Sequence, residues 1–228
     1  MKYSSAQDFI KAIRKAPYVD KRDFVRERVK GKNVLDIGCV QHSLERCLRS
    51  PECWLHNVIK VNAKSVLGID ILEKEIVELQ KLGHSVIVAD ATTVRLNTKF
   101  DVVVCGDIIE HLTNPGMLLE TVAYHLESDG IGLVTTPHPF AADRFFNVAL
   151  DGWTGVNTEH TCWFCPQTVF QLAERCGLYI DDFCWLKSLF PSPTKKALWG
   201  ALANATSRWA MRQNRMMHLD FGIALRRK

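Results

Sequence analysis

The sequence predicts an α/β domain in which helices cover both faces of a doubly wound, mostly parallel sheet of seven strands. Two apolar runs, Val34–Asp36 and Val66–Asp70, end in an acid about one strand–helix–strand unit apart, and Gly38 follows the first. In such sheets a nucleoside binds where strands end, and an acid there suits the hydroxyls of a ribose. Apolar runs alternate with helical patterns of about ten residues, which is typical of a parallel sheet covered on both faces.

Residues 1–31 are expected to form a helical extension ahead of the main domain. Apolar residues recur at helical spacing over 5–15, where Phe9 and Ile13 share a face, and again over 20–30. Pro17 separates the two helices, and Gly31 occupies the usual position after a helix C-terminus. The main domain is therefore expected to span 32–228.

The main domain is expected to alternate strands and helices, with two insertions. Strands are expected at 32–37, 65–70, 85–89, 100–105, 130–136, 178–186 and 218–226. Helices are expected over 41–60, with a break at Ser50-Pro51, and over 73–82, 115–127 and 166–176. The stretches 137–160 and 187–217 interrupt this rhythm, and the first, rich in aromatic and histidine residues, is expected to cover an active site.

Length and composition suit one globular domain. The 228 residues are 47% hydrophobic and 24% charged. No apolar run reaches the ~20 residues that span a bilayer. Residues 1–8 lack the apolar core of a signal peptide, so a cytoplasmic location is expected.

The net charge of +4 conceals basic ends around an acidic middle. Residues 1–32 hold ten Lys/Arg against four acids, 187–228 hold nine against one, and 33–186 hold ten against twenty. The ends are either solvated helix faces or surfaces for an anionic substrate or membrane. Their basic residues do not alternate repeatedly with aromatic ones, so a nucleic-acid groove is not indicated.

The second insertion mixes basic and apolar residues. Such a helix lies on an anionic membrane surface, or forms a lid or a dimer contact. The residues concerned are Lys195, Lys196, Leu198, Trp199, Leu202, Trp209 and Arg212.

The eight cysteines are scattered, and most are expected to be small buried thiols. Cys162 and Cys165 have the spacing of a metal-binding pair, with His160 close by. A zinc site needs four ligands, usually from two such pairs, and Cys176 and Cys184 do not supply a second pair at the right spacing. No metal is therefore assigned.

Six segments in order resemble the motifs of class I S-adenosylmethionine-dependent methyltransferases, in the broad group that acts on small molecules and glycans. They are Val34–Cys39, Gly68–Ile71, Val88–Thr92, Phe100–Leu112, Gly130–Pro137 and Glu159–Pro166. Each is weak alone, but six in this order at family-like spacing are a strong signal. The resemblance covers about 30–186 and implies a Rossmann-like fold, S-adenosylmethionine as cofactor and a small-molecule or glycan acceptor, and leaves the oligomeric state open.

The resemblance also implies which residues bind the cofactor. Asp70 would accept hydrogen bonds from the ribose, Asp90 and Ala91 would meet the adenine, and the loop after Asp36 would lie beneath the methionine part. The implied cofactor-binding residues are Asp36, Gly38, Cys39, His42, Asp70, Ile71, Asp90, Ala91, Gly106 and Asp107.

The first loop departs from the family pattern of two or three alternating glycines. Only Gly38 is kept, followed by Cys39–Ser43, and the stretch from there to Asp70 is longer than usual. A reshaped loop is expected, with His42 or Ser43 near the cofactor. The loss also argues against a nicotinamide dehydrogenase, whose pyrophosphate needs a tight G-x-G-x-x-G turn.

Three histidines are candidates for the base that removes a proton from a hydroxyl acceptor. His111 follows the strand at 100–105, His138 lies between two prolines, and His160 belongs to the last family-like segment. For each of them a structural role, such as packing or anchoring a helix, stays open.

The segment that contains Asp107, Glu110 and His111 also resembles one in ubiquinone-biosynthesis O-methyltransferases, where a divalent cation helps bind the acceptor. Oxygen ligands of this kind suit magnesium. The segment also occurs in metal-free relatives, so this site stays an alternative.

The first insertion is expected to bind the acceptor through Arg144, Phe145 and Trp153. Arg144 would pair with a phosphate or carboxylate of the acceptor, or else form a surface salt bridge. The function expected is O-methylation of a small molecule or sugar unit, with N-methylation still open. An RNA or protein methyltransferase and a non-catalytic S-adenosylmethionine-binding protein are the alternatives.

Overall fold

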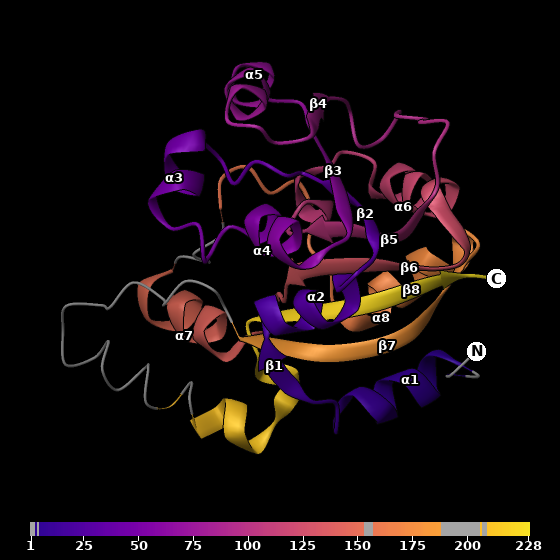
Figure 1. Ribbon diagram of the computed structural model, residues 1–228. Helices are drawn as coiled ribbons and strands as arrows, with labels where there is room; N and C mark the ends of the chain where they lie inside the picture. The colour runs from indigo at the N-terminus through magenta and orange to yellow at the C-terminus, as the bar shows by residue number, and fades with distance from the viewer. Residues whose placement is uncertain (1–2, 4, 153–156, 188–205, 207–208) are drawn as a thin grey trace.

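The computed structural model describes residues 3, 5–152, 157–187, 206 and 209–228. Its centre is an eight-stranded sheet in the order β1-β7-β8-β6-β5-β2-β3-β4 (Figure 1). All neighbouring pairs described are parallel except β6–β8 and β7–β8, so β8 runs against the other strands. The strands are β1 (Tyr18–Asp20), β2 (Asn33–Ile37), β3 (Ser65–Asp70), β4 (Val86–Val88), β5 (Phe100–Gly106), β6 (Leu126–Pro137), β7 (Leu178–Lys187) and β8 (Asp220–Arg227).

Helices pack on both faces, as predicted. Alternate residues along the strands enter two apolar cores because successive side chains point to opposite faces. Val34 and Val102 pack with α2 and α4 on one face, whereas Leu35 and Val103 pack with α1, α6 and α8 on the other. The helices are α1 (Ala6–Ile13), α2 (Lys21–Val29), α3 (Leu44–Arg49), α4 (Leu55–Asn62), α5 (Glu73–Lys81), α6 (Pro115–His125), α7 (Ala142–Asp151) and α8 (Pro166–Arg175), with short 3₁₀ turns η1 (Ile109–His111) and η2 (Arg215–Met217).

The sheet has one strand more than the seven predicted, and the additional strand is β1. It pairs in parallel with β7 through Tyr18 and Trp185, and the Trp185 amide donates to the carbonyl of Pro17 at 2.9 Å. A three-residue strand next to a proline carries too little alternation to be distinguished from a linker. The N-terminal segment 1–31 therefore contains the two predicted helices and also extends the sheet.

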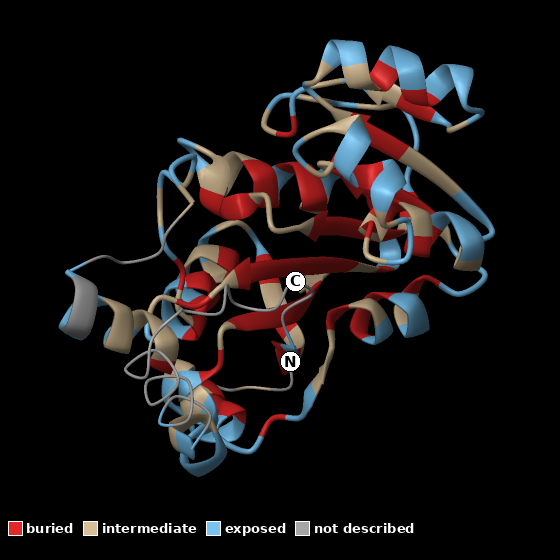
Figure 2. Ribbon diagram, turned by 90° about the vertical axis from the view of Figure 1, so that its left-hand side faces the viewer, coloured by how far each residue is buried: buried red, intermediate tan, exposed pale blue. Residues whose placement is uncertain are grey.

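The predicted break in the 41–60 helix is confirmed, because α3 ends at Arg49 and α4 begins at Leu55. A third, smaller core joins α3 and α5 to the loop after β2, around Cys39, Cys47 and Trp54. Figure 2 shows buried residues concentrated in the strands and on the inner sides of the helices. No described helix has the length and apolar character needed to cross a membrane.

Part of the second insertion, including Lys195 to Leu202, lies outside the described residues. Of the membrane-contact candidates, Trp209 and Arg212 are described, and Trp209 is exposed.

Candidate functional site

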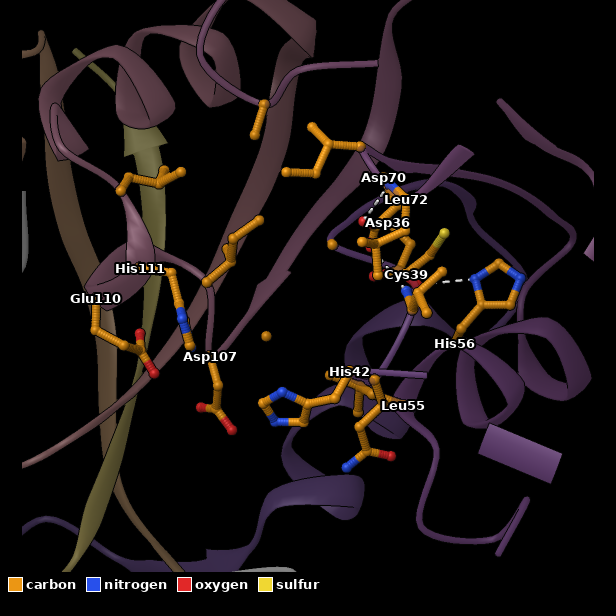
Figure 3. Close-up of a pocket in the computed structure, with 18 of the residues that line it drawn as sticks. Asp36, Cys39, His42, Leu55, His56, Asp70, Leu72, Asp107, Glu110 and His111 are labelled. Atoms are coloured by element: carbon orange, nitrogen blue, oxygen red, sulfur yellow. Dashed lines mark hydrogen bonds and ion pairs between the residues drawn. The ribbon is translucent and has the colours of Figure 1, made fainter. Parts of the chain in front are cut away.

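A cavity of about 710 Å³ opens at the carboxyl ends of β2, β3, β4 and β5 (Figure 3). This is the edge at which doubly wound sheets bind nucleotides, and the volume lies within the ~300–1,000 Å³ of ordinary ligand sites. Residues from the loops after all four strands line the cavity, together with the start of α4 and the segment 157–160.

Every residue that the sequence assigned to the cofactor lines this cavity. The set is Asp36, Gly38, Cys39, His42, Asp70, Ile71, Asp90, Ala91, Gly106 and Asp107. Because the loops that follow parallel strands meet at one edge, residues 70 positions apart in the chain come together here.

Asp70, at the end of β3, fixes the loop after β2. Its two carboxylate oxygens accept hydrogen bonds from the backbone amides of Val40, at 2.9 Å, and Leu72, at 3.2 Å. Burial raises the pKa of Asp70, and these backbone amides oppose the rise. Each carboxylate oxygen has a second lone pair, so Asp70 still has capacity to accept hydrogen bonds from a ligand.

Two glycines in the cavity wall lie close to side chains of neighbouring segments. Gly38 has a φ of +78°, and a Cβ there would lie 2.9 Å from the Ile108 side chain. A Cβ on Gly106 would lie 2.5 Å from Cδ2 of Leu55. A Cβ at either position would make the end of the neighbouring side chain shift, and Gly38 also has a left-handed backbone conformation that favours glycine.

The cavity wall also contains an ion pair between Lys21 and Asp107. Nζ of Lys21, at the start of α2, lies 2.5 Å from Oδ2 of Asp107 and 3.8 Å from Oδ2 of Asp220. Thr135 donates its hydroxyl to Oδ1 of Asp107 at 2.8 Å. Burial alone would raise the pKa of Asp107, but the Lys21 ammonium and the hydrogen bonds from Lys21 and Thr135 outweigh it and lower that pKa.

Glu110, in η1, is 2% exposed and accepts a 2.9 Å hydrogen bond from the Thr136 hydroxyl through Oε2. Its Oε1 is buried and has no hydrogen-bond partner among the described residues. Burial, reinforced by the charge of Asp107, raises the pKa of Glu110 to about 8. A carboxyl group of this kind can hold or release a proton near neutral pH.

We expect Glu110→Gln to become more stable relative to the wild type as the pH rises from about 5 to about 8. In this window the folded protein keeps the Glu110 proton, whereas the unfolded chain, with the ordinary pKa of 4.5, has lost it. The wild-type free energy of unfolding therefore falls with pH, while glutamine does not titrate. Urea denaturation of both proteins at several pH values measures this, and a pH-independent difference would contradict the pKa shift.

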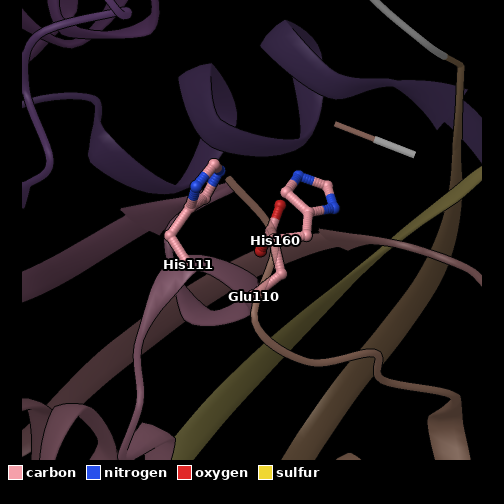
Figure 4. A group of neighbouring side chains, drawn as sticks. All are labelled: Glu110, His111 and His160. Atoms are coloured by element: carbon pink, nitrogen blue, oxygen red, sulfur yellow. The ribbon is translucent and has the colours of Figure 1, made fainter. Parts of the chain in front are cut away.

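His111 and His160 stand beside Glu110 (Figure 4). Their ring centroids are 4.7 Å apart in an edge-to-face arrangement. Burial lowers the pKa of His111 below its ordinary 6.5, and lowers that of His160 to about 4 with help from the charge of His111. Both imidazoles are therefore neutral at pH 7 and can accept a proton.

The same three side chains could hold a metal. Glu110, His111 and His160 each offer one ligand atom, and these atoms lie within 4.8 Å of one another. Two imidazoles and one carboxylate suit a divalent transition metal better than magnesium, which prefers oxygen ligands. Asp107, the acid of the acid-x-x-Glu-His segment, instead binds Lys21.

The cysteine pair of the sequence is not part of this cluster. Cys165 caps the N-terminus of α8, and Cys162 lies against backbone carbonyls of η1. Both residues therefore have structural contacts in the described part of the chain.

Three of the remaining predicted residues, His138, Arg144 and Phe145, do not line the cavity. His138 is fully buried against Trp185 and Phe221, with neither ring nitrogen hydrogen-bonded among the described residues. The Arg144 guanidinium lies over the Trp163 ring, 4.6 Å from its centroid. Phe145 is 68% exposed on α7, and Trp153 lies outside the described residues.

Neither Lys21 nor His56 was predicted from the sequence as a site residue, although both line the cavity. Lys21 belongs to a helix rich in charged residues, where another lysine carries no distinct signal. His56 is 1% exposed, and its Nδ1 lies 2.8 Å from Oδ2 of Asp36. The one feature of the sequence that could have pointed to His56 is its place in the lengthened stretch between Gly38 and Asp70.

A family model described as a methyltransferase domain matches residues 10–182 of the chain. The (S)-coclaurine N-methyltransferase of Papaver somniferum is 29% identical over 156 residues, which are 67% of this chain and 42% of that protein. The ubiquinone biosynthesis O-methyltransferase of Rickettsia prowazekii is 24% identical over 129 residues, 52% of this chain and 51% of that protein. The chain thus spans about half the length of these curated relatives.

The fold is similar to that of known structures. A crystal structure of magnesium protoporphyrin IX methyltransferase from Synechocystis PCC 6803 with bound SAH (S-adenosylhomocysteine) superposes with a TM-score of 0.57 at 15% identity, covering 91% of this chain and 82% of that one. At this identity the similarity concerns the fold.

Proposed function

Because the chain belongs to the methyltransferase-domain family and carries a class I S-adenosylmethionine-dependent methyltransferase domain, we propose that it catalyses O-methylation of a small-molecule or sugar hydroxyl. The observation that carries the proposal is the group of neutral imidazoles beside Glu110, across the cavity from the predicted nucleoside-binding acids.

The donor half of the cavity fits an adenosyl group with an amino-acid tail. Asp70 retains lone pairs for ribose hydroxyls. Gly38 and Gly106 line the cavity and present no side chain to it. S-adenosylmethionine, when bound, supplies a methyl group already activated by its sulfonium charge.

The chain's own residues orient the acceptor, exclude water and take up a proton. His111, neutral at pH 7 because of burial, is the proposed base for the acceptor hydroxyl. His160 and Glu110 flank it, so the proton taken up at the imidazole has polar neighbours. Holding the hydroxyl within about 3–3.5 Å of the methyl carbon makes the displacement effectively intramolecular.

A bound metal would use the same side chains differently. Glu110, His111 and His160 would hold the ion, and its positive charge would lower the pKa of the acceptor hydroxyl. Glu110 Oε1 fits this role because it is buried and has no hydrogen-bond partner among the described residues.

Two relatives support a small-molecule acceptor, since one is named for coclaurine and the other for ubiquinone biosynthesis. One is named an N- and the other an O-methyltransferase, so the hydroxyl preference rests on the proposed histidine base. An amine acceptor would need less base catalysis than a hydroxyl.

The test is S-adenosylhomocysteine formation by the purified chain with panels of hydroxylated small molecules, sugars, amines, RNA and protein. Turnover on a hydroxyl acceptor supports the proposal, and repeating it with a chelator and with added Mn²⁺ or Zn²⁺ separates the direct-base and metal routes. Transfer only to RNA or protein favours that alternative. Donor binding without turnover on any acceptor favours a non-catalytic binding protein.

A further inference from the structure

The feature without an assigned role is the start of α4, where Trp54, Leu55 and His56 line the cavity. Three consecutive side chains there contact three separate parts of the cavity wall. These contacts lie where the chain lacks the family's additional glycines and lengthens the stretch before Asp70.

Trp54 holds the loop after β2. Its indole Nε1–H donates to the carbonyl of Cys39 at 2.7 Å, and the side chain is 3% exposed. The buried indole N–H thus has its hydrogen-bond partner, and this bond is a second attachment of the loop besides Asp70. The loop is thus held by Asp70 at Val40 and by Trp54 at Cys39.

His56 holds the carboxylate at the end of β2. Its Nδ1–H donates to Oδ2 of Asp36 at 2.8 Å, and Asp36 is 2% exposed. His56 Nε2 is buried without a hydrogen-bond partner in the described part of the chain. Trp54 and His84 pack on the imidazole, with ring centroids 5.2 and 5.3 Å away, so its orientation is fixed.

Leu55 completes the contacts by lying against Gly106, where a Cβ would be only 2.5 Å from its Cδ2. The N-terminus of α4, which carries the positive end of the helix dipole, lies in the cavity wall and is not capped by a described side chain. Asp36 therefore offers an anionic group, and α4 an electropositive one, in the same wall. An amino-acid zwitterion requires this pair of charges.

We propose that the α4 clamp, defined as Trp54, Leu55 and His56, replaces the missing glycines and positions the methionine end of the donor. Trp54 and His56 act through Cys39 and Asp36, so they are positioning residues. The inference rests on the proposed function, because it requires an adenosyl donor whose amino-acid tail reaches Asp36.

The test compares two ligands by isothermal titration calorimetry: S-adenosylhomocysteine, which carries the amino-acid tail, and adenosine, which lacks it. We expect His56→Leu to weaken S-adenosylhomocysteine binding by about tenfold or more, the scale of a lost hydrogen bond to a charged group. Adenosine affinity should stay within about twofold. His56→Asn, which keeps a donor near the Nδ1 position, should recover most of the loss, and Trp54→Phe should show the same selectivity.

Two controls accompany these variants. Asp70→Asn should weaken the binding of both ligands, because both contain the ribose that Asp70 is proposed to bind. Val61→Ala, at an exposed position of the same helix that does not line the cavity, should leave both affinities unchanged. Thermal unfolding checks that each variant is folded.

An equal loss for both ligands in His56→Leu, or no loss for either, would overturn the clamp while leaving the donor assignment standing. A wild-type protein that binds adenosine but gains nothing from the amino-acid tail would overturn the clamp as well. Failure of the wild type to bind either ligand would overturn the proposed function and the clamp with it.

Discussion

Replacing His111 with alanine is expected to lower kcat by about 10²–10⁴-fold, the usual contribution of a positioned base. The affinity for S-adenosylhomocysteine should change by less than about twofold, because the cofactor half of the cavity is untouched. The lowered pKa of His111 also fixes the pH profile. The midpoint of the acidic limb of the wild-type pH–rate profile should therefore lie below pH 6.5, and His111→Ala should lose that limb.

His160→Ala is the matched control, because His160 contacts His111 and lines the same cavity. The pKa of His160, about 4, makes it a weaker base than His111. We therefore expect His160→Ala to lower kcat less than His111→Ala does. An equal loss of kcat in His111→Ala and His160→Ala, together with activation of the wild type by added metal, would indicate a metal site. Retained turnover in His111→Ala would place the base elsewhere.

Replacing Lys21 with methionine is expected to lower the free energy of unfolding by about 2–4 kcal/mol. The side chain of Lys21 is only 5% exposed, and its loss removes the ammonium group that pairs with Asp107 and Asp220. The side chain of Asp107 is 40% exposed, so water screens part of the cost of the unpaired charge. Urea denaturation at pH 7 measures the change.

Arg26→Ala provides the comparison, because Arg26 forms an exposed pair with Asp23 on the same helix. Its loss should change the unfolding free energy by no more than about 1 kcal/mol. Adding Asp107→Asn to Lys21→Met should recover part of the loss, since a neutral amide needs no cation. A Lys21→Met protein as stable as the wild type would show that the buried pair contributes nothing to folding.

The fold was predictable because its strands are short apolar runs with acids at their ends. Asp36, Asp70 and Asp90 lie at or just after the carboxyl ends of β2, β3 and β4, and a parallel sheet brings these ends to one edge, independently of the loops between them. Strand β1 was missed because three residues of exposed and half-buried character carry no period.

Most predicted residues that line the cavity lie in the loops that follow strands, whereas His160, before α8, was predicted only from the family resemblance. His138 also follows a strand, yet its ring turns into the core formed by Trp185 and Phe221. Arg144 packs on Trp163, a contact between segments that no local pattern encodes. Lys21 and His56 reach the cavity because tertiary packing directs one face of their helices inward, and a single polar residue on a helix does not reveal which face that is.

Strand β8 also limits the order in which the protein can be assembled on the ribosome. It lies between β6 and β7, so the two halves of the sheet stay unjoined until residues 220–227 have emerged. The same strand carries Asp220, which contacts Lys21 across the sheet. In a nascent chain stalled before β8, the edges of β6 and β7 that β8 would cover stay unpaired. Unpaired strand edges can pair with strands of other chains. Such stalled chains should depend on chaperones, and a chain released after β8 should not.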